Sequence, residues 1–248
     1  MNRKNAEQYQ AQIADKVTQN DTVVKRTIRS FLVKYRFLHK WYKRMVFVSL
    51  YALHRVPNLA AAHRILDVGV GPGDLFGYLK LFCNGNADFL GVDLAKNILL
   101  PEDIAFLECD IETAPLPCKD SSFDLVVSTF LLEHVQDSSN IFSEAYRVLK
   151  PGGYLYVVTE NWTSVFVPGK ENFYQDPTHV RPYSPESLSR LAEMYGLTVS
   201  YVKPLRRWVY IALLPFYPIL KIMRLSEPMN FSPYEIFGPK VVIIAQKP

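Results

Sequence analysis

Short apolar stretches alternate with amphipathic ones from residue 64 to the end of the chain, and this alternation limits the fold more than any other feature. The apolar stretches have the length of β-strands, and the stretches between them repeat apolar residues at helical spacing. Strands separated by helices form βαβ units and a parallel sheet. The predicted strands are 64–68, 88–92, 105–108, 123–128, 154–159, 198–202 and 241–245, and the predicted helices are 74–82, 138–149 and a third from Ser184 to Gly196.

The amino-terminal part, residues 1–60, differs in character from the rest. Ten basic residues and no acidic one fall between residues 22 and 66, although the net charge of the whole chain is only +4. No Gly or Pro interrupts residues 22–56, and aromatic residues such as Phe31 and Trp41 alternate with the basic ones, so we predict one or two helices there. Such helices either lie on an anionic surface, a membrane or RNA, or cap the protein core with one solvated basic face.

Residues 61–248 are predicted to form one α/β domain, which a chain of 248 residues can accommodate. It carries a substrate-side loop at 161–183 and an apolar insert at 204–238, between the last two strands. Within the insert, residues 208–220 are uncharged but are broken by Pro215 and Pro218, and they are fewer than the roughly 20 that span a bilayer. We therefore expect a lid or an interfacial anchor.

Neither the three cysteines nor the amino terminus points to secretion. The cysteines show no C-x-x-C spacing, and residues 1–21 lack the apolar stretch of a signal peptide. We expect a cytoplasmic protein, either free or in peripheral contact with the inner face of the membrane. The sequence does not predict the oligomeric state.

A glycine-rich turn, Gly69-Val70-Gly71-Pro72-Gly73, follows the first predicted strand and opens a helix. Glycines there let the backbone approach a nucleotide-like ligand, and the helix amino terminus offers free N–H groups. The dinucleotide pattern G-x-G-x-x-G fails, because Asp74 or Phe76 stands at its third glycine position. Asp67 would repel a pyrophosphate, yet it can hold a cationic amino-acid moiety directly or through water.

Two further carboxylates follow the next two strands. Asp93 ends the second strand, where it is placed to accept both hydroxyls of a ribose. Asp110 ends the third strand and can accept from an adenine amino group, while Ile111 offers its backbone N–H and an apolar face. Three strand ends therefore carry carboxylates suited to an adenosine ligand with an ammonium group.

Five motifs in order resemble class I S-adenosylmethionine-dependent methyltransferases of the methyltransferase type 11 group. They are D-V-G-V-G-P-G, Asp93, C-D-I, F-D-L-V-V-S-T-F-L-L-E-H-V and R-V-L-K-P-G-G-Y-L, between residues 64 and 159. The resemblance implies a Rossmann-like, seven-stranded, mostly parallel sheet with one antiparallel strand, and S-adenosylmethionine as cofactor. It assigns Gly69, Gly71 and Gly73 to the methionine and ribose side, Asp93 to the ribose, Asp110 and Ile111 to adenine, and Thr129 and Phe130 to the pocket floor. Asp67, Val70 and Leu94 complete the predicted cofactor site.

The segment 176–186 is similar to a segment of bacterial methyltransferases associated with cell-surface polysaccharide, where it borders the active site. The similarity implies a substrate-side role for Asp176, Arg181 and Tyr183. His179 lies between proline-limited turns beside an arginine, which suits deprotonation of a hydroxyl, so it is the first candidate for a general base. The alternative is that Asp176, His179 and Arg181 only hold a loop over the cofactor.

His134 is the second candidate base, although a histidine packed beneath the pocket would look the same in sequence. Glu133, His134 and His179 are also suitable metal ligands. With three candidates on separated segments, we expect no metal.

Direct displacement on the sulfonium methyl by a substrate oxygen is the predicted reaction. The predicted acceptor is a sugar, glycan or lipid-linked small molecule. RNA methylation by way of the basic helices is the alternative, but Ser128-Thr129-Phe130-Leu131 stands where an N-P-P-Y-like tetrapeptide would be expected. A scaffold that binds the cofactor without catalysis is a third class, which the intact pocket carboxylates disfavour.

Overall fold

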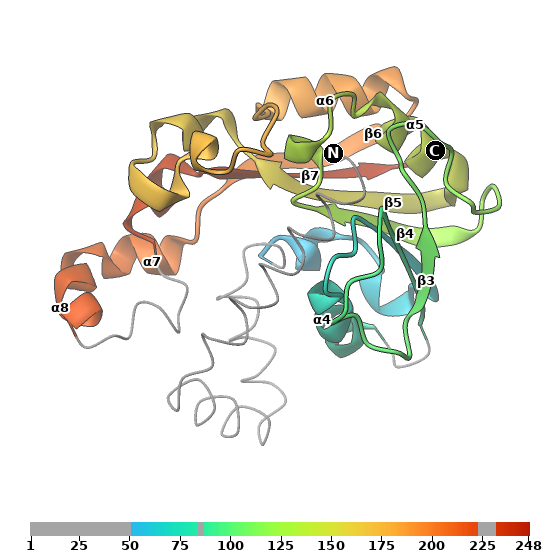
Figure 1. Cartoon of the computed structure of the whole chain (residues 1–248), viewed down its shortest axis with the longest axis horizontal. Helices are drawn as coiled ribbons and strands as arrows, with labels where there is room; N and C mark the ends of the chain where they lie inside the picture. The colour runs from blue at the N-terminus through green and yellow to red at the C-terminus, as the bar shows by residue number, and fades with distance from the viewer. Residues whose placement is uncertain (1–50, 84–86, 223–231) are drawn as a thin grey trace.

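A computed structural model describes residues 51–83, 87–222 and 232–248 of the chain (Figure 1). The predicted helices within residues 22–56 lie almost wholly outside the described residues, as does the segment 1–21. The part of this region that is described contains two 3-10 helices, Leu53–Arg55 and Leu59–Ala61. Ala52, Leu53, Val56 and Leu59 are buried against the domain, so the amino-terminal part enters the core before residue 60.

Seven strands form one sheet in the order β3-β2-β1-β4-β5-β7-β6. The strands are β1 (Arg64–Val68), β2 (Asp88–Asp93), β3 (Ala105–Glu108), β4 (Phe123–Thr129), β5 (Leu149–Glu160), β6 (Thr198–Leu205) and β7 (Lys240–Gln246). Strand β7 runs antiparallel to β5 and β6, and the four other pairings are parallel. The predicted fold, a mostly parallel seven-stranded α/β sheet with one antiparallel strand, is confirmed.

Helices cover both faces of the sheet, with α5 (Ser139–Val148) and α6 (Pro185–Met194) on one face and α4 (Asp74–Phe82) on the other (Figure 1). Successive residues of a strand point to opposite faces. In β1, Leu66 packs with the core under α5 and α6, whereas Ile65 packs with the core under α4. Both cores are apolar because both faces of the sheet are covered, which explains the nearly continuous apolar runs of the central strands.

The largest differences from the predicted boundaries concern β5 and β6. Strand β5 begins at Leu149 instead of residue 154, because Leu149 pairs with Phe123 before an irregularity in the β4–β5 register. Strand β6 continues through Pro204 to Leu205. Proline is tolerated there because β6 lies at the edge of the sheet and needs no second hydrogen-bonded neighbour.

The insert between β6 and β7 forms two short helices, α7 (Trp208–Leu213) and α8 (Tyr217–Ile222), which project from one end of the sheet (Figure 1). A buried ion pair fixes the base of this projection: the guanidinium of Arg207 pairs with Glu235 and lies 4.3 Å from the ring centroid of Tyr210. Each of the described helices is too short or too polar to cross a membrane.

The loop from 161 to 183 winds through three 3-10 helices, Trp162–Phe166, Gly169–Glu171 and Phe173–Gln175. Helix α6 then begins as predicted from the sequence. The Ser184 side chain accepts from the backbone N–H of Ser187 while the Ser187 side chain accepts from the N–H of Ser184, and Pro185 occupies the first turn. This cap fixes the end of the loop beside the sheet.

Candidate active site

The glycine turn connects β1 to α4 with a backbone that few other residues could adopt. Gly69, Gly71 and Gly73 all have positive φ, at 81°, 48° and 77°. A Cβ on Gly69 would lie 3.0 Å from Leu131, whereas the space above Gly71 is open. The turn is therefore closed by protein on one side and accessible to a ligand on the other.

Asp93 ends β2 directly beside this turn. Its carboxylate accepts from the backbone N–H of Gly71 at 2.9 Å and from that of Leu94 at 2.7 Å. Burial raises the pKa of Asp93, and the two backbone hydrogen bonds oppose that rise. Each carboxylate oxygen can accept a second hydrogen bond, so Asp93 can hold the glycine turn and still accept from a diol.

Asp67 is buried in β1, and among the described residues its Oδ1 has no hydrogen-bond partner. Burial, and then the charge of Asp93, raise the pKa of Asp67 to about 8. A buried carboxyl oxygen without a partner requires a donor, such as an ordered water or the ammonium of an amino-acid moiety. This environment fits a cationic ligand group, reached directly or through water.

A cavity that is open to solvent lies at the carboxyl ends of β1, β2 and β3. It is lined by Val68, Gly69, Val92, Asp93, Leu94, Cys109, Asp110, Ile111, Glu112, Leu131, His134 and Val135. A mostly apolar wall with a few carboxylates suits adenosine. The donor set therefore fits S-adenosylmethionine.

Not every predicted cofactor residue lines this cavity. Gly69, Asp93, Leu94, Asp110 and Ile111 do. Val70 is buried beneath the turn. Its side chain fills the space that a Cβ on Gly91 would need.

Thr129 and Phe130 were predicted to form the floor of the pocket. Phe130 is 36% exposed, with positive φ at 57°, and the Lys240 ammonium lies 5.7 Å from its ring centroid. Leu131 is the residue of this segment that forms part of the cavity wall, and Thr129 and Phe130 lie beside it.

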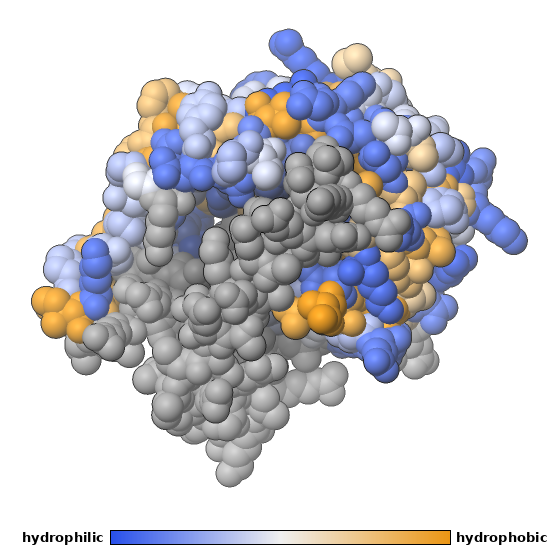
Figure 2. Space-filling model, in the orientation of Figure 1, coloured by the Kyte–Doolittle hydropathy of each residue, from blue (hydrophilic) through white to orange (hydrophobic). Residues whose placement is uncertain are grey.

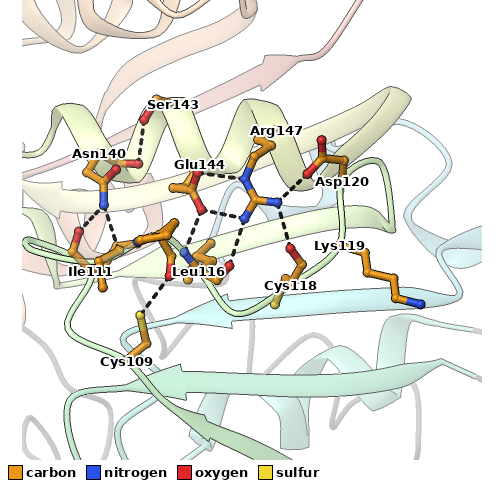
Figure 3. A network of polar contacts seen from close by, with 12 residues as sticks. Cys109, Ile111, Leu116, Cys118, Lys119, Asp120, Asn140, Ser143, Glu144 and Arg147 are labelled. Carbon is orange, nitrogen blue, oxygen red and sulfur yellow. Dashed lines mark hydrogen bonds and ion pairs between the residues drawn. The ribbon is translucent and has the colours of Figure 1, made fainter.

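A polar network holds the segment that follows β3 against α5 (Figure 3). Arg147 donates to the backbone carbonyls of Leu116 and Cys118, and it pairs with Glu144 and Asp120. Asn140 donates to the carbonyl of Ile111 at 2.5 Å. These contacts fix the segment that follows β3, and with it Asp110 and Ile111.

Replacing Arg147 with Met should reduce the unfolding free energy at pH 7 by on the order of 2–3 kcal/mol, because buried Glu144 loses its cationic partner. The hydrogen bond from Arg147 holds the pKa of Glu144 below its usual value in the folded protein. A depressed folded pKa stabilises the fold above the unfolded pKa, and that stabilisation is lost as pH falls through the folded value. Urea denaturation should therefore show a smaller difference between variant and wild type at pH 3 than at pH 7.

Lys80→Met is the matched control, because the ion pair of Lys80 with Asp103 is exposed. It should leave the unfolding free energy near that of wild type. A difference between Arg147→Met and wild type that stays constant with pH would assign the loss to packing of the arginine stem and not to the ion pair.

The two candidate bases lie against each other at the rim of the cavity. The ring centroids of His134 and His179 are 4.8 Å apart. Nδ1 of His134 is hydrogen-bonded at 2.8 Å to the hydroxyl of Thr178, which is 44 residues further along the chain. Burial, and then His179, lower the pKa of His134 to about 4. His179 is held by a 2.7 Å hydrogen bond between its Nδ1 and the carbonyl of Phe173.

The predicted substrate residues take different places. Asp176 accepts from the Thr178 hydroxyl at 2.6 Å, so it supports the residue that holds His134. Tyr183 is buried in the core, where its hydroxyl lies 3.0 Å from Ser138 Oγ and 3.3 Å from the Leu132 carbonyl. Arg181 donates to both Tyr183 and Ser138. These contacts fix the loop on the segment that follows β4.

Glu133 lies behind the histidines and is 1% exposed. It accepts from the Thr159 hydroxyl at 2.7 Å, and its carbonyl accepts from the backbone N–H of Val180 at 2.7 Å. Burial raises the pKa of Glu133 to about 7, despite the hydrogen bond from Thr159.

Sequence reasoning missed Leu131, Val135, Cys109 and Glu112, which line the cavity, and the Arg147 network behind it. The signal for Leu131 and Val135 was their position in the segment that follows a central parallel strand, where ligands bind in open α/β sheets. Arg147 gave no signal of its own, because its partners lie at least 27 residues away apart from Glu144.

The sheet order, the glycine turn with its strand-end carboxylates and the cavity between them define a class I S-adenosylmethionine-dependent methyltransferase domain. Residues 66–157 match the family model of the methyltransferase domain, and this segment belongs to that family. The family match covers the glycine turn, Asp93, Asp110 and His134, but ends before His179.

Proteins similar to this chain carry related names. A probable S-adenosylmethionine-dependent methyltransferase of Mycolicibacterium smegmatis is 30% identical over 162 residues, 64% of this chain and 60% of the relative. The mitochondrial ubiquinone biosynthesis O-methyltransferase of Mus musculus is 30% identical over 225 residues, 75% of this chain and 59% of the relative. The chain therefore spans less than two thirds of either relative.

A solved structure shares the fold. The phosphoethanolamine N-methyltransferase 2 of Haemonchus contortus, in complex with phosphomonomethylethanolamine and S-adenosylhomocysteine, matches with a TM-score of 0.62 and 18% identity, over 84% of this chain and 57% of that one.

Proposed function

We propose that this protein transfers the methyl group of S-adenosylmethionine to an oxygen atom of a sugar, glycan or lipid-linked small molecule. The observation that carries the proposal is the contact between His134 and His179 at the rim of a cavity whose wall holds Asp93 and Asp110. One side of the cavity suits the cofactor, and the histidines stand where an acceptor hydroxyl could lose its proton.

The chain holds the cofactor through residues of three strand ends. Asp93 would accept from the ribose hydroxyls, Asp110 and Ile111 would contact adenine, and the open face of Gly71 would admit the ligand to the backbone. When bound, S-adenosylmethionine supplies an electrophilic methyl group on a sulfonium sulfur. The protein contributes orientation of the two reactants and a site for the proton.

His179 is suited to act on that proton. The carbonyl of Phe173 can only accept, so Nδ1 of His179 carries the hydrogen and the lone pair lies on Nε2. A hydroxyl that approaches Nε2 can donate to it, which increases the nucleophilicity of the oxygen. Asp176, Arg181 and Tyr183 would then act by fixing the loop that carries His179.

Two features support the acceptor class. The segment 176–186, which resembles that of polysaccharide-associated methyltransferases, folds against the cavity through His179 and Thr178. The mouse relative is named an O-methyltransferase of ubiquinone biosynthesis, which supports an oxygen acceptor.

A transfer assay with methyl-labelled S-adenosylmethionine tests the acceptor class. Protein is incubated with the labelled cofactor and, in parallel, with total lipid extract, lipid-linked glycan or total RNA. Base-stable label in the lipid or glycan fraction is expected, since ethers resist hydrolysis. Label found only in RNA would contradict the proposal. RNA would then be the methyl acceptor, bound by the basic amino-terminal segment.

We further propose that α7 and α8 contact an anionic bilayer without crossing it. Trp208, Phe216, Ile219 and Ile222 are 65%, 56%, 57% and 82% exposed, and Figure 2 shows hydrophobic residues gathered at the projecting end where α8 lies. Lys221 lies beside Ile222 on the same helix. Tyr210 is buried under Arg207, so it is not part of this face. Exposed aromatic and aliphatic residues beside a basic residue suit a headgroup boundary.

Co-sedimentation with vesicles containing phosphatidylglycerol should show binding that weakens as salt is raised. Replacing Trp208 and Ile222 with Ser should reduce the bound fraction several-fold, because each loses buried apolar area at the interface. Met194→Ser is the control, since Met194 is 76% exposed at the end of α6. Protein that stays in the supernatant at low salt would make α7 and α8 a lid and favour a water-soluble acceptor.

A further inference from the structure

We propose that Glu133, His134 and His179 form a binding site for a divalent transition-metal ion such as zinc. One ligand atom from each residue lies within 4.8 Å of the other two. The three residues come from two segments that are distant in sequence, and a backbone hydrogen bond between them, from the N–H of Val180 to the carbonyl of Glu133, fixes their approach. The expectation from the sequence was that no metal binds.

Both imidazoles are oriented as metal-ligating histidines usually are, with one ring nitrogen donating to a protein oxygen and the other carrying a lone pair. For His179 the oxygen is the carbonyl of Phe173. For His134 it is the hydroxyl of Thr178, which gives its own hydrogen to Asp176 at 2.6 Å and therefore accepts from His134. Each ring thus has its lone pair on Nε2.

Glu133 supplies the carboxylate, and a hydrogen bond from a neighbouring residue orients this group as well. Thr159 donates to its Oε2, which sets the orientation of the group and leaves Oε1 as the oxygen to be shared. A carboxylate that is 1% exposed is costly to ionise, and a cation beside it offsets that cost. Lys240 does not serve this purpose directly, because its ammonium pairs with Glu160.

The donor types select the class of metal. Two imidazoles and one carboxylate suit zinc, cobalt, nickel or iron, whereas magnesium and calcium prefer sites made of oxygens. Metal–nitrogen bonds are about 2.0–2.1 Å, so two ligand atoms on one tetrahedral ion would lie roughly 3.3–3.4 Å apart. The spacing of up to 4.8 Å therefore requires the ligand atoms to approach by about 1–1.5 Å on metal binding, a movement that the two half-buried histidines can supply.

Three protein ligands leave at least one coordination position open, which is typical of catalytic and not of structural zinc sites. His134 also lines the cofactor cavity, so the open position would lie near the acceptor. An ion there would lower the pKa of an acceptor hydroxyl. With its lone pair on the ion, His179 would then act as a metal ligand and not as the proton acceptor. This role rests on the proposed function, but metal binding itself does not.

Cobalt titration of the full-length protein, after removal of metals by chelator, tests the site without cofactor or acceptor. We expect one equivalent of cobalt to give the visible absorption of a bound ion, and zinc to displace it with micromolar or tighter affinity. His179→Ala and Thr178→Val should weaken zinc binding by at least 10-fold, because the first loses a ligand and the second loses the orientation of His134. Calorimetry with zinc gives the same comparison independently.

His63→Ala is the matched control, since His63 is an exposed histidine outside the cluster. It should bind zinc as wild type does, and zinc should raise the melting temperature of both but not that of His179→Ala. Circular dichroism checks that each variant is folded. If His179→Ala does not fold, the zinc affinity of Thr178→Val tests the site instead. Failure to bind one equivalent, or equal binding by wild type and the cluster variants, would overturn the site while leaving the methyl-transfer assay unaffected.

Discussion

Replacing Asp93 with Ala should weaken the binding of S-adenosylhomocysteine by about 1–3 kcal/mol, a roughly 5- to 150-fold change in dissociation constant. Two losses add here. The ribose hydroxyls lose their acceptor, and the N–H groups of Gly71 and Leu94 lose the carboxylate that holds the glycine turn. Calorimetric titration measures the change directly.

Asp88→Ala serves as the control for this experiment, and Asp93→Asn as the conservative variant. Asp88 is exposed at the opposite end of β2, so its loss should leave the affinity unchanged. The amide of Asn retains one acceptor oxygen and nearly the same volume, so Asp93→Asn should bind with an affinity between those of wild type and Asp93→Ala. Equal affinity for Asp93→Ala and wild type would contradict the assignment of the ribose to the end of β2.

The second large effect is expected from His179→Ala, which should lower turnover by roughly 100-fold or more while cofactor affinity changes little. His179 contacts His134 and Phe173 and is not part of the cavity wall, so its loss leaves the cofactor contacts in place. The measurement is single-turnover methyl transfer, combined with calorimetry of S-adenosylhomocysteine.

The control for this variant is His63→Ala. His134→Ala is less informative, because His134 both lines the cavity and touches His179. If His179→Ala loses cofactor affinity and turnover to the same extent, then His179 only holds the loop in place, and another group must act on the acceptor's proton.

Much of the fold could be predicted because its signals are local. Strand and helix patterns in β1, α4 and β3 gave the observed boundaries. Strand β1 is followed by Gly69, helix α4 begins directly after Gly73, and β3 ends at Glu108. The places of Asp93 and Asp110 followed from the rule that parallel strands end at one edge of the sheet. Local pattern and topology agree at these positions, which makes them predictable.

The rest depends on contacts between distant segments. That Glu133, His134 and His179 meet requires the loop 161–183 to fold back over β4, and no periodicity in the sequence reports this. Tyr210 belongs to an apolar run that the sequence predicts at the surface. It is buried instead, packed against Arg207, which forms a buried ion pair with Glu235. Buried charges of this kind are paired only through the tertiary fold, so sequence patterns cannot place them.

Calorimetric titration of the full-length protein with S-adenosylhomocysteine, and in parallel with NAD⁺, tests the central claim most directly. Gly69 of the glycine turn, Asp93 and Asp110 line a cavity whose mostly apolar wall suits adenosine, and the turn lacks the third glycine of the dinucleotide pattern. We expect one site per chain with micromolar or tighter affinity for S-adenosylhomocysteine and no measurable binding of NAD⁺. Binding of NAD⁺ without binding of S-adenosylhomocysteine would contradict the account.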